Sequence, residues 1–186
     1  MRLLGRRAPG APEANSDDEV LRRLAPSVHR WVSALIGPTA DLDDVAQEAL
    51  IEVAVALDRF EGRSKLSTYA HRVVVRVALR HRRRPRREEP TLDVVPTPTN
   101  EIDPERIAMS REATRRLYRA LDELSDKLRI AFVLCAIEGQ AHADAAGIAG
   151  CSVETLRARL KRARRELEVR LRTDVYLAPL FREERK

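Results

Sequence analysis

Residues 85–104 constrain the fold most, because they can form neither a helix nor a central sheet strand. They hold five of the ten prolines, and the run from Glu88 to Glu105 has six acidic residues and no basic one. Proline lacks the backbone N–H used by helices and sheets, and it favours extended geometry in the preceding residue. We therefore expect a Pro-rich acidic linker at residues 85–104 between two modules, residues 16–84 and 105–172, with tails at residues 1–15 and 173–186.

The first module has the apolar spacing of three helices. The first helix is expected from a capping position at Ser16 to a stop at Gly37. The second begins after Asp41, which is a favourable N-cap, and runs to about residue 59. The third begins near Ser67 and ends before Pro85. Aromatic residues make up only 4% of the chain, which favours small helical cores of Leu, Val and Ala over a β-sandwich.

The second module also reads as helices only. The first is predicted from Pro104 through Leu124, the next from Ser125 to Gly139, a short one near residues 141–149, and a long basic one after Ser152. The short helix, a tight turn at residues 150–152 and the long helix form the pattern of a helix-turn-helix, whose second helix enters the DNA major groove. The expected fold is thus all-α, with two small helical domains.

Charge and composition limit the classes of binding partner and the cellular compartment that can be expected. The formal net charge is +6 and the sequence pI is about 9.9, so a polyanion is the first partner to consider. No apolar run is long enough to span a bilayer, and the first fifteen residues lack the hydrophobic stretch of a signal peptide. Cys135 and Cys151 are expected to be free buried thiols, which suits the cytoplasm, and no membrane insertion is expected.

The helix after Ser152 has a basic and an apolar side. The thirteen positions that follow Ser152 contain six Lys or Arg residues and one carboxylate. Its Leu, Val and Ala positions return at helical spacing and should face the core. Arg157 and Arg162 would then project where arginine can pair with guanine, while Lys161 and Arg165 can neutralise phosphates. A merely solvated charged face is the alternative; the scarcity of acids and the preceding short helix favour DNA.

Two stretches resemble bacterial RNA polymerase sigma factors. Residues 41–79, DLDDVAQEALIEVAVALDRFEGRSKLSTYAHRVVVRVAL, look like region two, and residues 121–167, from LDELSDKL to KRARREL, look like region four. The presence of these two regions alone, joined by a short linker, resembles the extracytoplasmic-function (ECF) family. The resemblance implies a non-enzymatic promoter-specificity subunit that needs no cofactor. Such a subunit binds core RNA polymerase and directs promoter recognition, local melting and initiation.

The resemblance also implies three sets of site residues. One face of the helix after Asp41 would dock on the clamp of the largest beta-type polymerase subunit through Asp44, Gln47, Glu48 and Ile51. The third helix and the loop before it would read and melt the minus-10 element through Arg63, Lys65, Tyr69, Arg72, Arg76 and Arg80. The last helix would read the minus-35 element through Thr155, Arg157, Ala158, Lys161, Arg162 and Arg165.

Several roles stay open at this point. Tyr69 could be a platform for an unstacked base or a core aromatic residue, and Arg76 stands where many ECF members have Asn, which bears on base preference. The resemblance places the acidic linker in the polymerase interior, whereas composition allows a simple tether. It also implies an anti-sigma factor as a further partner. We expect the four histidines, which lack ligand-like spacing, to be exposed or partly buried: His29, His71, His81 and His142.

Two other classes of protein fit parts of the pattern. A stand-alone helix-turn-helix regulator would need a dimerisation surface to read paired half-sites, and no heptad or third module supplies one. A metal-dependent nuclease would use an acidic cluster on the second helix, but no histidine or further acid is positioned by the sequence to complete it, so no metal site is expected. The acids concerned are Asp41, Asp43, Asp44 and Glu48.

Overall fold

The computed structural model describes residues 14–84 and 104–178, which form seven α-helices and one π-helical turn. The prediction of an all-α protein is confirmed. The expected linker, apart from Pro104, lies outside the described residues, as do most of the two expected tails.

The N-terminal half consists of α1 (Ala14–Ile36), α2 (Leu42–Leu57) and α3 (Leu66–Arg82), each packed against the other two. Helix α2 starts directly after Asp41, as its cap predicted. Helix α1 starts two residues before Ser16, so this serine lies inside the helix and the prediction that it caps the helix is wrong. Gly37 ends α1 with φ of 82°, a left-handed conformation that favours glycine.

The C-terminal half contains α4 (Pro104–Asp122), α5 (Asp126–Phe132), the π turn η1 (Val133–Ile137), α6 (His142–Ala149) and α7 (Val153–Leu171). The helix predicted from Ser125 to Gly139 is present, but its second part is wider than an α-helix. There the Glu138 N–H donates to the carbonyl oxygen of Val133, five residues back, at 2.9 Å. Helix α5 packs mainly on α7.

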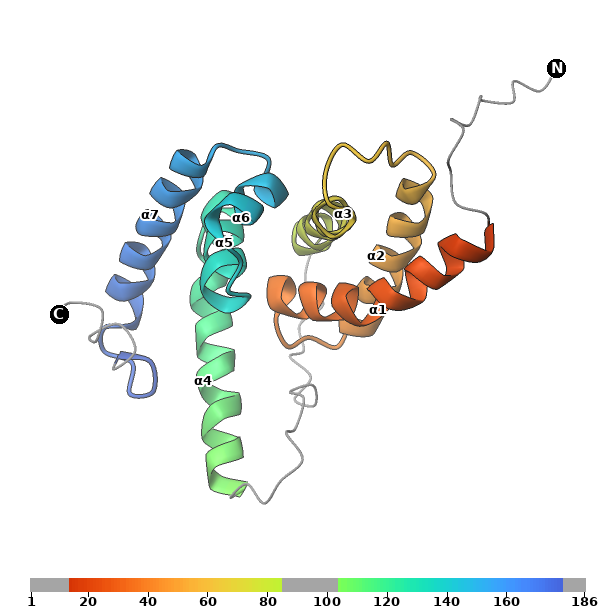
Figure 1. Ribbon diagram of the computed structural model, residues 1–186. Helices are drawn as coiled ribbons and strands as arrows, with labels where there is room; N and C mark the ends of the chain where they lie inside the picture. The colour runs from red at the N-terminus through yellow and green to blue at the C-terminus, as the bar shows by residue number, and fades with distance from the viewer. Residues whose placement is uncertain (1–13, 85–103, 179–186) are drawn as a thin grey trace.

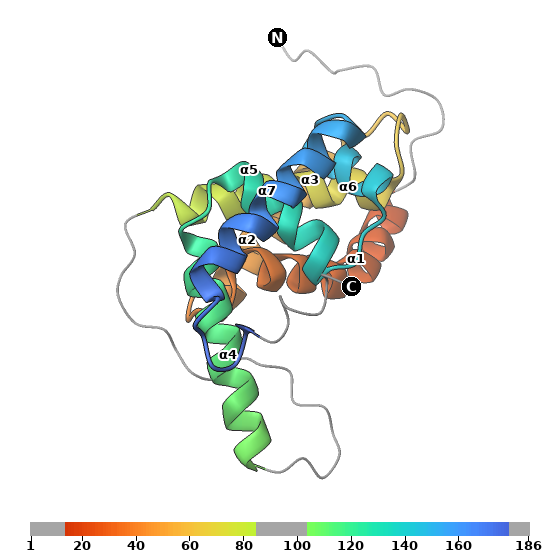
Figure 2. The ribbon, with the colours of Figure 1, turned by 90° about the vertical axis from the view of Figure 1, so that its left-hand side faces the viewer.

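The two halves pack directly on each other. Figure 1 shows α3 of one half beside α6 of the other, with α4 extending away below them. Figure 2, viewed from the side of α7, shows this helix lying outermost across the molecule. The buried apolar side chains of both halves belong to one continuous cluster. Helix α3 is therefore covered on two faces, by α1 and α2 on one and by α6 on the other.

This double coverage corrects one prediction. The side chain of His71 on α3 is only 1% exposed, so the expectation that it is exposed or partly buried is wrong. Its ring stacks on Trp31 with centroids 4.2 Å apart, and its Nε2 lies 3.4 Å from Oε1 of Glu138. The C-terminal half covers it, and neither the spacing nor the type of the residue revealed that neighbour.

The cysteines match their prediction in part. Cys135 and Cys151 are both free, as expected. Both are partly exposed, however, so the expectation of full burial is wrong. Burial nevertheless raises the pKa of the Cys135 thiol above its usual value.

Candidate nucleic-acid interface

The turn between α6 and α7 has the geometry that a tight helix-to-helix connection requires. Gly150 ends α6 in the left-handed conformation with φ of 63°, and the Cys151 N–H donates to the carbonyl oxygen of Ala146 at 3.1 Å. Ser152 then caps α7, its Oγ accepting a hydrogen bond from the Thr155 N–H at 3.2 Å. A short helix, a three-residue turn and a long helix thus follow one another as in a helix-turn-helix.

Helix α7 separates apolar from basic side chains. Leu156, Leu160, Ala163 and Leu167 are buried against the rest of the C-terminal half, as their spacing predicted. All six residues expected to face the minus-35 element are exposed: Thr155, Arg157, Ala158, Lys161, Arg162 and Arg165. The Arg162 Nε donates to Oε1 of Glu166 at 2.9 Å, a weak surface pair that leaves the Arg162 side chain 74% exposed.

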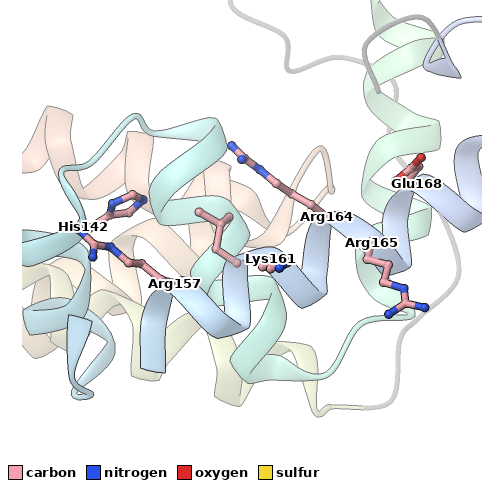
Figure 3. A pocket seen from close by; sticks show the side chains of 7 residues that line it. His142, Arg157, Lys161, Arg164, Arg165 and Glu168 are labelled. Carbon is pink, nitrogen blue, oxygen red and sulfur yellow. The ribbon is translucent and has the colours of Figure 1, made fainter. Parts of the chain in front are cut away.

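A shallow groove runs along the basic side of α7. Figure 3 shows His142 and Arg157 at one end of this groove, Lys161 in the middle, and Arg165 with Glu168 at the other end. Arg164 and Leu160 complete the lining. The sequence analysis missed His142 as a lining residue. Its place in α6 was the available signal, since the first helix of a helix-turn-helix crosses the DNA backbone.

The basic residues expected to read the minus-10 element fall into two groups. Arg72 and Arg76 on α3 are exposed and have no ion-pair partner among residues 18–84 and 106–178, and Arg63 in the preceding loop is exposed beside Glu61 at 2.7 Å. The Lys65 Nζ, by contrast, donates to Oδ1 of Asp144 on α6 at 3.1 Å. One cation of the expected DNA surface is thus engaged by the other half of the molecule.

The remaining two residues of this set have structural partners. Arg80 donates to Glu48 at 2.8 Å and also to Glu52, and these bonds raise the pKa of its guanidinium. The Tyr69 hydroxyl donates to the carbonyl oxygen of Ala56 at 3.1 Å, and its ring packs on Phe60. The partly buried Tyr69 side chain thus makes the contacts of a packing residue, and its role toward DNA stays a prediction.

The expected docking face on α2 is exposed and partly apolar. Asp44 and Gln47 point to solvent, and Ile51 and Val55 are 58% and 57% exposed. Glu48 differs from the other expected docking residues, because Arg80 and Arg84 hold its carboxylate. The sequence showed acids on α2 and bases on α3 but did not show that they pair.

The acids of the alternative nuclease do not converge on one point. Asp41 lies 3.6 Å from His81, Asp43 lies 3.2 Å from His29, and Glu48 binds Arg80. Among the described residues, no three His, Cys, Asp or Glu side chains gather as metal ligands would. Likewise, no helix in the described part of the chain is long and apolar enough to cross a membrane.

A basic recognition helix held by a short helix and a tight turn defines a helix-turn-helix DNA-binding protein. Comparison with known proteins identifies the family to which this DNA-binding protein belongs. Residues 20–88 match the family model of sigma-70 region 2, and residues 114–167 match that of sigma-70 region 4. Together with the relatives described next, these matches show that the chain belongs to the ECF family of RNA polymerase sigma factors. Residues 14–84 are called region two below, and residues 104–178 region four.

Relatives of known name support this assignment. The chain is 30% identical over 156 residues to the ECF RNA polymerase sigma-E factor of Escherichia coli (strain K12), covering 78% of this chain and 79% of the relative. It is 31% identical over 153 residues to the ECF sigma factor SigE of Mycolicibacterium smegmatis, covering 81% of this chain and 59% of that relative.

Two solved structures share the fold. CnrH, in complex with the cytosolic domain of CnrY, aligns with a TM-score of 0.63 at 22% identity, covering 87% of this chain and 91% of that chain. RpoE of Bartonella quintana, in complex with the anti-sigma factor NepR, aligns with a TM-score of 0.60 at 22% identity, covering 87% of this chain and 99% of that chain.

Proposed function

We propose that this chain binds core RNA polymerase and directs it to a limited set of promoters, where it recognises both promoter elements and begins local melting. One observation carries the proposal: α7 presents a row of exposed basic side chains from a helix-turn-helix in a chain that also contains region two. The protein acts as a specificity subunit, and the chemistry of RNA synthesis belongs to the polymerase.

Helix α7 is proposed to read the minus-35 element. Arg157 and Arg162 supply guanidinium groups for base edges, and Lys161 and Arg165 supply phosphate contacts. Both pairs are exposed on the solvent side of the helix. His142, at the end of the same groove, is positioned for the adjacent DNA backbone.

Region two is proposed to engage the minus-10 element with fewer cations than its sequence suggested. Arg63, Arg72 and Arg76 remain exposed for the DNA backbone or an unpaired strand. Arg80 is neutralised by the carboxylates of Glu48 and Glu52, so its side chain links α3 to α2 by ion pairs in this structure. Its removal is therefore expected to affect folding before DNA binding.

The exposed face of α2 is proposed to dock on the clamp of the polymerase. Ile51 and Val55 together expose an apolar strip beside Asp44 and Gln47, and an apolar centre with a polar rim is typical of protein interfaces. We further infer that an inhibitory protein partner exists, because RpoE of Bartonella quintana was solved with an anti-sigma factor. Because core RNA polymerase is the proposed partner, the protein is proposed to work in the cytoplasm.

Transcription in vitro with core polymerase on a genomic promoter library tests this function. We expect run-off products from a limited promoter set that depend on the added chain, and comigration of the chain with core enzyme. If neither is seen, the proposal fails. A stand-alone regulator, the second candidate class, would instead bind specific DNA as a dimer without core enzyme.

A substitution on the exposed face of α2 tests whether this face binds core polymerase. Ile51→Glu should abolish comigration with core enzyme and leave the circular dichroism spectrum unchanged, because the side chain is exposed. Val175→Glu makes the same kind of change at a residue that is 82% exposed in the C-terminal segment, and it should bind normally. Equal losses from both variants would remove the case for α2 as the docking face.

A further inference from the structure

We propose that Arg80 on α3 is a positioning residue of the polymerase-docking face on α2, where it holds the Glu48 carboxylate ready for a hydrogen-bond donor of the polymerase. The inference rests on the proposed function, because it concerns the same exposed face of α2. It assigns Arg80 to the binding of core polymerase instead of the reading of the minus-10 element.

Two carboxylates of α2 share the Arg80 guanidinium. Its Nη2 donates to Oε1 of Glu48 at 2.8 Å and to Oε1 of Glu52, which lies one turn further along α2. A terminal nitrogen of the guanidinium has two hydrogens, so one nitrogen serves both acceptors. The hydrogen bond to Glu52, followed by that to Glu48, raises the pKa of Arg80. The cation is therefore permanent, and its position is set by α2.

The Glu48 carboxylate is held through only one of its two oxygens. Arg84, which follows α3, has its Nη2 3.5 Å from the same Oε1 that Arg80 binds. Oε2 makes no hydrogen bond or ion pair within the described residues, and it is not one of their buried polar atoms that lack a partner. The side chain is 34% exposed. The carboxylate thus has one oxygen fixed by α3 and one oxygen open to a partner.

This carboxylate lies beside the apolar strip of the docking face. Residues three or four apart are neighbours on the surface of a helix, so Glu48 lies between Asp44 and Ile51. Ile51 is 58% exposed. Protein interfaces combine an apolar centre with hydrogen bonds at a polar rim. Glu48 has the place of such a rim residue, and Arg80 fixes the geometry in which it is presented.

The same ion pairs argue against a DNA contact by Arg80. Arg76, one turn earlier on α3, is exposed and has no ion-pair partner in the described part of the chain, so its charge is available to phosphates. The charge of Arg80 is offset by Glu48 and Glu52. A phosphate that approached Arg80 would also approach these two carboxylates, which repel it. The two arginines therefore differ in function although they lie on the same helix.

A carboxylate that is fixed before binding makes docking more favourable. A free glutamate side chain populates several rotamers, and the loss of this freedom at an interface weakens binding by roughly two- to tenfold. Exposed ion pairs, in contrast, contribute little to folding stability, and the Arg80 side chain is 45% exposed. The main effect of losing Arg80 is therefore expected in the affinity for core polymerase, with a smaller effect on stability.

A double-mutant cycle on the binding of the full chain to core polymerase tests this role. In a titration, Arg80→Ala should lower the affinity by about three- to tenfold. In a chain that already carries Glu48→Ala, the same change should alter the affinity by less than about 1.5-fold, because the carboxylate that Arg80 positions is absent. Equal losses in the two chains would mean that Arg80 does not act through Glu48 and would overturn the proposal, as would an unchanged affinity of Arg80→Ala.

Two comparisons separate docking from other effects. Arg23→Ala breaks an exposed ion pair of the same kind, with Glu19 at 2.9 Å within α1, and should leave the affinity for core polymerase unchanged. With core polymerase at saturating concentration, Arg80→Ala should open minus-10 DNA as well as the unsubstituted chain does, whereas Arg76→Ala should open it less well. A defect of Arg80→Ala that saturating core polymerase does not repair would contradict the assignment to docking.

Arg80→Lys replaces Arg80→Ala in the cycle if circular dichroism shows that the alanine variant does not fold. Lysine keeps the charge but lacks the planar fork of the guanidinium, so a smaller loss is expected, and this loss should again vanish beside Glu48→Ala. A loss that persists there would overturn the proposal. Ile51→Glu separates the two levels of inference. If it abolishes binding while Arg80→Ala binds normally, the docking face stands and the role of Arg80 fails. If the unsubstituted chain does not bind core polymerase, the proposed function fails and this role fails with it.

Discussion

Replacing Arg129 by methionine should show how strongly the two regions depend on each other. The change keeps an unbranched side chain but removes the guanidinium, so the buried Leu35 carbonyl loses its donor and Asp122 loses the cation at 2.8 Å. An unsatisfied buried carbonyl costs about 1–3 kcal/mol, and removal of a buried charge returns part of that loss. We therefore expect Arg129→Met to lower the free energy of unfolding by about 2 kcal/mol.

Loss of this hydrogen bond should also let the two regions unfold separately, because Arg129 belongs to region four and the Leu35 carbonyl belongs to region two. Trp31, the only tryptophan, stacks on His71 at the interface and reports region two by fluorescence, while circular dichroism reports all helices. In urea, the two signals should coincide for the unsubstituted protein and diverge for Arg129→Met. Arg119→Met, at an exposed position of α4, should change neither. Coincident transitions with a shift below about 0.5 kcal/mol would refute the reasoning.

Three further predictions concern single sites. In holoenzyme binding assays, Arg157→Ala should weaken the binding free energy at cognate minus-35 sequences by roughly 1–3 kcal/mol and relax the base preference there. Arg165→Ala should lower the affinity for all sequences evenly and reduce the slope of log affinity against log salt concentration by about one. Equal effects of the two variants would refute the claim of base reading. Ile51→Asp should reduce affinity for core polymerase at least tenfold in a pull-down titration without changing the melting temperature. Gly37→Ala should destabilise the protein by more than about 1 kcal/mol in thermal melts, because of its positive φ and the Tyr118 ring, and Tyr118→Ala in the same chain should recover part of that loss.

The helices and the exposed basic side of α7 could largely be predicted from the sequence. Local rules govern both. Asp41 directly precedes α2 without making a capping hydrogen bond, whereas Ser152 caps α7. Gly37 and Gly150 end helices in left-handed geometry, and Leu156 repeats with its neighbours at helical spacing. Such signals depend on a few adjacent residues. They therefore predict a helix and its ends without knowledge of the tertiary contacts.

The contacts between regions could not be read in the same way. The periodicity of α3 predicts one buried face, yet Val74, Val75 and Ala78 are buried as well as Val73 and Val77. The unbroken run of three valines was the available signal, since a helix that is apolar on several sides is covered on several sides. The elements that cover α3 lie far from it in the sequence, and so do the carboxylates of α2 that pair with Arg80. Local sequence patterns therefore could not predict these contacts.

The π turn at Val133–Ile137 absorbs one residue without changing what faces the N-terminal half. A π turn holds one residue more than an α turn, yet both complete one full rotation about the helix axis. A sigma factor with a single deletion here would close an ordinary α turn and would keep a residue equivalent to Glu138 opposite His71. Relatives can therefore differ in length by one residue in this turn and still present the same side chain at this contact.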